Sequence, residues 1–265
     1  MRLFVSDIKR GLGMWQFWLC VALLTGTGVY GLKNEFLCLT VVEFTKAYGF
    51  LGTLNRLFYS FYFLNVYMDY AILACAVILF STVTCKEMKS GFLANERLRI
   101  SPNAFILSRI LSTLVIGMMA FLLANAITLL VWFIVDPNPS VILEDMPGQM
   151  GVLYDHSLWL YCLVYMLYSM LYIGGYSLFS MGAALIWRNQ YVGYIVPIIY
   201  YYIRSVIIGG FFGYEGVEKL TFFTSKYMIS YLHTVAEALA ALLIVYIIGI
   251  SLIFAGYHRW RKGVW

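Results

Sequence analysis

Residues that could carry out catalysis are few in this sequence and lack suitable neighbours. The three histidines, His156, His233 and His258, are isolated, with no other metal ligands at a useful spacing. The chain contains neither the HExxH of zinc proteases nor the Gly-x-Ser-Gly of rhomboid-type proteases. The segment 213–219, GYEGVEK, lacks the spacing of the GxxxxGK[ST] loop that holds ATP phosphates. We therefore predict no catalytic residue, no metal site and no cofactor held by this chain.

Two charged residues lie deep within apolar stretches. Asp69 is about 16 residues, or roughly 24 Å, from the predicted inner end of its stretch, and Arg204 is about 13 residues, or roughly 20 Å, from its own. Charges at such depth are costly and tend to face a cavity or a partner, and their similar depth allows the two residues to pair. In the alternative interpretation Arg204 extends to the outer headgroups and Asp69 lies at the interface.

The segment 86–102, KEMKSGFLANERLRISP, could bind another protein. It combines mixed charge with two adjacent apolar side chains, Phe92 and Leu93. A small helix with exposed apolar side chains suits docking into a groove on a partner. The alternative is an ordinary basic loop on the inner side of a membrane, with a helix at its surface.

Long apolar stretches must position all of these residues. Hydrophobic residues make up 62% of the chain and charged residues 12%, whereas a soluble domain is roughly a quarter charged. A bilayer core requires about 20 apolar residues per helical span, and its backbone groups must bond within the helix. We predict an all-α polytopic membrane protein that forms a single domain over 1–265. Its six spans are expected at 14–32, 61–85, 105–135, 158–186, 191–213 and 236–257.

The distribution of charge predicts the orientation of these spans. If the N-terminus lies inside, the inner connecting segments hold twelve of the 18 Lys and Arg residues, and the outer connecting segments hold five. Both termini are therefore expected to be cytoplasmic, and the first apolar stretch is expected to be a retained span rather than a cleaved signal. The net charge of +5 then reflects topology and contact with anionic lipid, not nucleic-acid binding.

Two further segments are expected to lie at the membrane surfaces. Residues 2–13 can form an amphipathic inner helix with Leu3, Phe4, Ile8 and Leu12 on one face, and with Asp7, Lys9 and Arg10 elsewhere. Residues 214–235 are too apolar for a plain loop and too short for two spans, which favours an outer re-entrant hairpin. The five cysteines form no CxxC pair, and we interpret them as small packing residues.

The inner segment resembles the corresponding loop of type-2 ABC transporter permeases. The similar stretches are Glu-x-x-x-Gly-Phe-Leu at 87–93 and LRISPNAFILSRIL at 98–111. The positions that match the family pattern are Glu87, Gly91, Ser101, Pro102 and Arg109. The family also has six spans, an inner amphipathic N-terminal helix, both termini inside and an outer re-entrant segment between spans five and six.

This resemblance implies a transmembrane permease subunit, without catalytic activity, of an ATP-binding cassette exporter in the cell membrane, with a bacterial plasma membrane expected. A separate ATPase subunit would hold ATP and Mg, and a second permease, identical or related, would complete the path. Spans two and five would line the central cavity, so Asp69 and Arg204 could form a gate in it or contact cargo. Cargo is expected to be an amphipathic peptide of the antimicrobial or lantibiotic type, or a hydrophobic drug. The alternatives are a lipid or glycan exporter, and a channel or assembly factor without ATPase. Coupling to the ATPase would involve Glu87, Gly91, Phe92, Leu93, Glu96, Arg97 and Arg99.

Overall fold

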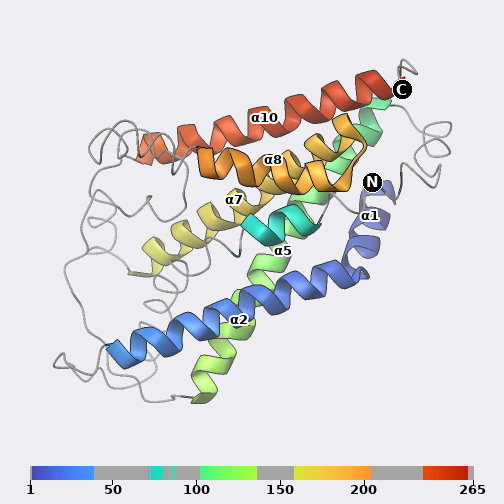
Figure 1. Ribbon diagram of the computed structural model, residues 1–265. Coiled ribbons are helices and arrows are strands. Elements are labelled where there is room, and N and C mark those ends of the chain that lie inside the picture. The colour runs from blue at the N-terminus through green and yellow to red at the C-terminus, as the bar shows by residue number, and fades with distance from the viewer. Residues whose placement is uncertain are drawn as a thin grey trace.

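The computed structural model describes residues 2–38, 71, 73–79, 85, 87, 102–135, 158–203 and 235–261. Helices and short turns account for these residues, and no strand occurs among them, so the all-α prediction is confirmed for this part of the chain. A helical stretch at 73–79 lies within the predicted second span. The principal helices (Figure 1) are α1 (Arg2–Leu12), α2 (Trp15–Cys38), α5 (Pro102–Val135), α7 (Leu158–Trp187), α8 (Gln190–Tyr202) and α10 (Val235–Arg261).

Three of these helices are long and apolar enough to cross a membrane. The qualifying segments are Asn103–Thr128 of α5, Met166–Trp187 of α7 and Leu242–Arg259 of α10. Segments of α1 and α2, bent by 61° relative to each other, pass the same test as a pair. These helices support a membrane protein. The six-span arrangement stays a prediction, and the proposed hairpin at 214–235 lies almost entirely outside the described residues.

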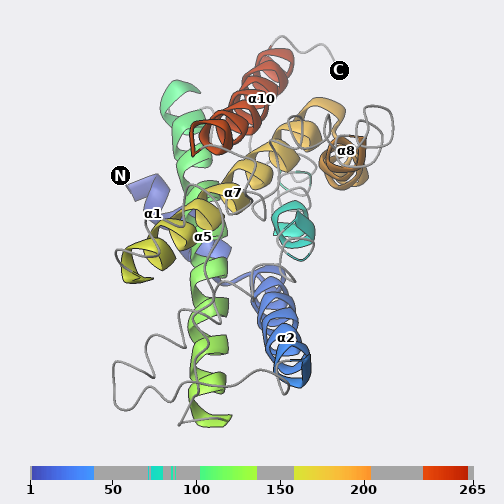
Figure 2. The same cartoon turned by 90° about the vertical axis from the view of Figure 1, so that its left-hand side faces the viewer.

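α7 occupies the centre of the described bundle. α10 packs along it, α8 returns beside it, and α5 crosses it (Figures 1 and 2). Helix α5 contacts α7, α2 and α1. Within its apolar segment, 89% of α7 is buried, compared with 28% for α10. α10 therefore leaves most of its surface free to face lipid.

Glycines allow α7 and α10 to approach closely. A Cβ on Gly182 of α7 would lie 2.7 Å from Cβ of Leu252 and 2.9 Å from the Gly249 carbonyl oxygen. A Cβ on Gly249 would in turn lie 2.9 Å from the backbone nitrogen of Phe179. Small residues at helix contacts are typical of membrane proteins, where close backbone approach replaces the hydrophobic effect as the main source of attraction.

A very short turn joins α7 to α8, within the gap between the predicted spans 158–186 and 191–213. Arg188 adopts a φ of 51°, a left-handed conformation that ends α7. Asn189 is extended, and its side-chain oxygen accepts a 2.9 Å hydrogen bond from the backbone N–H of Tyr191, which caps α8. Two residues therefore suffice to reverse the chain.

Candidate functional site: a buried ion cluster

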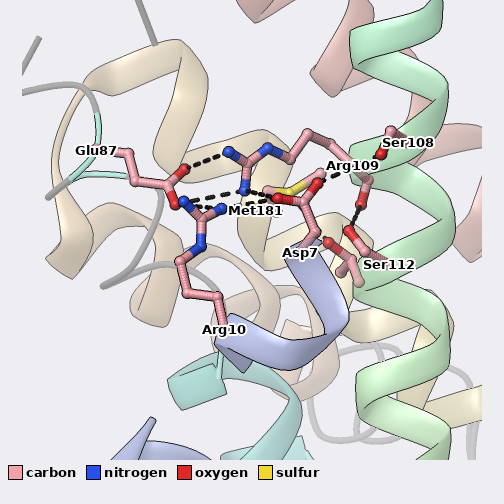
Figure 3. Close-up of polar contacts among 8 residues, drawn as sticks. Asp7, Arg10, Glu87, Ser108, Arg109, Ser112 and Met181 are labelled. Carbon is pink, nitrogen blue, oxygen red and sulfur yellow. Dashed lines mark hydrogen bonds and ion pairs between the residues drawn. The ribbon is translucent and has the colours of Figure 1, made fainter. Parts of the chain in front are cut away.

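Four charged side chains converge where α1 meets α5. Asp7 and Arg10 come from α1, Arg109 comes from the second turn of α5, and Glu87 comes from the beginning of the predicted inner segment (Figure 3). We refer to Asp7, Arg10, Glu87 and Arg109 as the ion cluster. It joins three parts of the chain that lie far apart in sequence.

Each arginine contacts both carboxylates of the ion cluster. Arg10 Nη2 lies 2.9 Å from Asp7 Oδ1 and 2.8 Å from Glu87 Oε1. Arg109 binds Glu87 through both terminal nitrogens, with Nη2 3.1 Å from Oε2 and Nη1 3.3 Å from Oε1. Arg109 Nη1 also lies 3.5 Å from Asp7 Oδ1. The forked geometry of the Arg109–Glu87 pair is the stronger and more directional form of such a contact.

Neighbouring side chains on α5 complete the surroundings of the ion cluster. The Ser108 hydroxyl donates a 3.3 Å hydrogen bond to Asp7 Oδ2, the second oxygen of that carboxylate. The Arg109 guanidinium lies 5.2 Å from the centre of the Phe105 ring, a cation–π distance. Phe105 packs edge-on against Tyr257 of α10 at 5.6 Å between ring centres. The cluster is thus held against α10 as well as α1 and α5.

Local sequence explains why α1 can reach this position. Asp7 and Gly11 are four residues apart and therefore share a face of α1. Because Gly11 has no side chain, this face can press against Ile116 of α5, where a Cβ would overlap the Ile116 side chain. α1 ends at Leu12, and the chain turns through Gly13 and Met14 before α2 begins. The bend allows α1 and α2 each to pack against α5.

The ion cluster is largely removed from solvent. The side chain of Asp7 is 4% exposed, those of Arg109 and Glu87 are 11% and 12% exposed, and Arg10 is 35% exposed. Two positive and two negative charges cancel, which limits the cost of burying them. Removal of one member would leave an uncompensated charge in a poorly solvated place, a change that is strongly destabilising.

This arrangement is suited to holding helices together rather than to catalysis. Both carboxylates already bind arginines, and a general base must instead reach a proton on a substrate. Among the described residues no group of three or more His, Cys, Asp and Glu side chains could hold a metal ion. The cluster instead acts as a polar joint, because it fixes the position of Glu87 relative to α1 and α5.

The structure places only part of the predicted site. Glu87 lies in the ion cluster, beside Arg109, another residue that matches the family pattern. Other predicted positions lie outside the described residues. For coupling to an ATPase these are Gly91, Phe92, Leu93, Glu96, Arg97 and Arg99, and for a cavity or gate they are Asp69 and Arg204.

Asp7 and Arg10 were not predicted as site residues. We expected Asp7 to lie off the apolar face of the first helix and gave it no role, whereas the structure buries its side chain, at 4% exposure. The apolar side chains suggested a helix lying on lipid, whereas tertiary contact with Arg109 and Ser108 turns the Asp7 face inward. The opposite charges of Asp7 and Arg10, three residues apart, were the available signal.

The side chains of Cys20, Cys75 and Cys85 are buried, in agreement with a packing role. Cys20 Sγ lies 3.6 Å from the Cys75 carbonyl oxygen, and Cys75 Sγ lies 3.6 Å from that of Cys20. Cys85 Sγ lies 3.9 Å from the Ala184 carbonyl oxygen. Each thiol therefore has a weak acceptor nearby and helps to hold adjacent helices together.

Comparisons with protein-family models, with curated proteins and with solved structures find no match to this chain.

Proposed function

We propose that this chain is the transmembrane permease subunit of an exporter driven by a separate ATP-binding cassette subunit. The inner segment that begins near Glu87 would rest on that ATPase. Six spans from this chain would form half of the path, and a second permease would form the other half. The proposal rests on the resemblance of the inner segment to type-2 ABC permeases and on the way Glu87 is held by Arg10 and Arg109.

The observation that carries the proposal is the forked ion pair between Glu87 and Arg109, with Nη2–Oε2 at 3.1 Å. The two residues are 22 positions apart, so their contact closes the base of the intervening segment. A push on that segment would then be passed to α5 rather than absorbed by a hinge.

Helix α5 is suited to transmit a movement of the inner segment across the membrane. It runs without a break over 34 residues, from Pro102 to Val135, or about 51 Å. That length exceeds the hydrocarbon core of about 30 Å, so one rigid rod would connect the inner segment with the far side of the membrane. Through Arg10, the same push would reach α1 and the elbow that leads into α2.

We further propose that Asp69 and Arg204 face the central path or gate it, and that the cargo is an amphipathic peptide or a hydrophobic drug. The abundance of aromatic residues, 18% of the chain, favours apolar cargo over a strongly polar one. Transport by vesicles that contain Asp69→Arg, Arg204→Asp and the double exchange tests the pairing. Failure of the double exchange to restore any transport would remove it.

The central test separates binding of an ATPase from coupling to it. Tagged chain is purified from its native membrane, and ATP hydrolysis and co-purifying P-loop proteins are measured. Phe92→Glu should abolish co-purification, because it places a charge on the docking surface. Glu87→Gln should retain the ATPase but lose cargo-stimulated hydrolysis, because it weakens the joint. Lys9→Gln, an exposed change on α1, is the matched control. A chain that purifies alone and conducts ions would instead support a channel.

A further inference from the structure

Pro197 interrupts the backbone hydrogen bonds of α8. It lies inside the helix, which runs from Gln190 to Tyr202. In a regular α-helix the backbone N–H of residue 197 would donate to the Gly193 carbonyl, four residues earlier, but proline has no N–H. Gly193 and Pro197 are both buried in an apolar helix, where bulk water does not supply a donor. The Gly193 carbonyl therefore needs a donor from another part of the chain.

Ser180 of α7 supplies this donor. Its hydroxyl donates a 2.9 Å hydrogen bond to the Gly193 carbonyl oxygen. Ser177, one turn earlier on α7, instead donates at 2.8 Å to the Ile173 carbonyl of its own helix, which is the usual solution for a hydroxyl inside an apolar helix. Ser180 thus replaces, from a neighbouring helix, the backbone donor that Pro197 lacks.

The same hydroxyl also contacts a third helical segment. Ser180 Oγ lies 3.0 Å from the carbonyl oxygen of Val77, which belongs to the helical stretch 73–79. Ser180 is 0% exposed and Val77 is 1% exposed, so both groups are shielded from solvent. A serine hydroxyl carries a single proton, and donation to one carbonyl therefore weakens donation to the other. The carbonyls of Gly193 and Val77 compete for this proton.

The part of α7 that carries Ser180 is held firmly against α10. Close backbone contacts flank it on both sides: a Cβ on Gly249 of α10 would lie 2.9 Å from the Phe179 nitrogen, and a Cβ on Gly182 would lie 2.9 Å from the Gly249 carbonyl oxygen. Interiors packed this closely resist small displacements. A change in the acceptor of the Ser180 proton would therefore move α8 or the stretch 73–79 rather than α7.

We propose that Ser180 is a hydrogen-bond switch between α8 and the stretch 73–79. With the proton on the Gly193 side, α8 is held against α7 in the turn before Pro197. With the proton on the Val77 side, the Gly193 carbonyl loses its donor, and α8 can bend at Pro197, where no backbone hydrogen bond resists. The two segments lie within the predicted spans 61–85 and 191–213. The switch would thus link the two spans expected to line the path, a role that rests on the proposed function.

A double-mutant cycle tests whether Ser180 compensates for Pro197. Ser180→Ala, Pro197→Ala and the double variant are compared by thermal unfolding of the full chain in detergent. Ser180→Ala should lower Tm, and the loss should be smaller by about 2 °C or more in the Pro197→Ala background, because a backbone N–H at position 197 can then bind Gly193. Ser177→Ala is the matched control and should cost the same in both backgrounds, since Ser177 donates to its own helix. Equal losses for Ser180→Ala in both backgrounds would overturn the proposal.

Amide hydrogen exchange of the Pro197→Ala chain tests whether one proton serves two helices. Once position 197 supplies a donor to Gly193, the Ser180 proton is left to Val77, so amides in the stretch 73–79 should exchange more slowly by about twofold or more. Adding Ser180→Ala should abolish this slowing. Unchanged exchange over 73–79 would overturn the switch, because Ser180 would then serve Gly193 alone. Neither measurement uses cargo or an ATPase, so failure of the switch is distinguishable from failure of the proposed transport function.

Discussion

Gly11 of α1 lies so close to Ile116 of α5 that a Cβ on the glycine would overlap the isoleucine side chain. This contact sets the distance between the two helices next to the ion cluster. The bonds of Asp7 and Arg10 therefore depend on a glycine that has no polar group in its side chain. Close packing and charge pairing reinforce each other at this place.

Gly11→Ala should therefore lift α1 from α5 and weaken the ion cluster. Overpacking of this kind costs about 1–3 kcal/mol, which thermal unfolding of the purified chain would detect. Ile116→Val removes Cδ1, the atom that a Cβ on Gly11 would meet first, so the double variant should recover much of the loss. Gly13→Ala, where the nearest atoms lie at 3.6 Å, is the control. Equal loss in Gly11→Ala with and without Ile116→Val would argue against steric contact as the cause.

Neutralising Asp7 should destabilise the protein far more than neutralising Lys9 on the same helix. Asp7→Asn leaves two arginines with one carboxylate in a buried place, at a cost of roughly 3 kcal/mol. Lys9 is exposed, and Lys9→Gln should change the stability by less than about 0.5 kcal/mol. Urea or thermal unfolding in detergent measures both variants. Similar effects of the two substitutions would contradict a structural role for the buried carboxylate.

Substitutions at Arg188 should depend on backbone conformation more than on charge. Both Arg188→Ile and Arg188→Gly remove the guanidinium, but only the β-branched residue opposes a φ of 51°. The isoleucine variant should be less stable than the glycine variant by about 1–2 kcal/mol. Comparison of the two melting temperatures isolates the backbone contribution. Equal stability would mean that the turn between α7 and α8 can adopt another conformation.

The contact between α7 and α10 should be sensitive to a single added methyl group. Gly182→Ala would place Cβ 2.7 Å from Cβ of Leu252, so one of the two helices must move. We expect a loss of about 1–3 kcal/mol, measured by thermal unfolding. The control is Gly26→Ala in α2, which meets nothing within 4 Å and should be neutral or slightly stabilising. Unchanged stability of the Gly182→Ala variant would show that the contact between α7 and α10 is not tightly packed.

Composition and hydropathy alone predicted several of the helices correctly. The predicted stretches 105–135 and 158–186 correspond closely to α5 and α7, and 236–257 lies within α10. These helices could be predicted from the sequence because a lipid-exposed or fully packed helix must be apolar over its whole length. The sequence also marks the position of the short turn after α7, because Arg188 and Asn189 interrupt the apolar run between two helices.

The ion cluster could be predicted only in part. Glu87 and Arg109 stand out because they match a family pattern, although the sequence does not say that they bind each other. Asp7 looked like one more polar residue on a surface helix, and Gly11 gave no signal at all. Which face of α1 is buried depends on where Arg109, Ser108 and Ile116 lie on another helix.

The sequence by itself determined that this chain is rich in long apolar helices and where several of them begin and end, because the cost of exposing or burying a side chain is set locally. The tertiary structure alone decided that Asp7 faces inward, that both arginines share both carboxylates, and that α7 and α10 meet at glycines. Those outcomes depend on distances between residues far apart in the chain, which local periodicity does not encode. The charge and the volume of a side chain select a particular neighbour only when two helices are packed against each other.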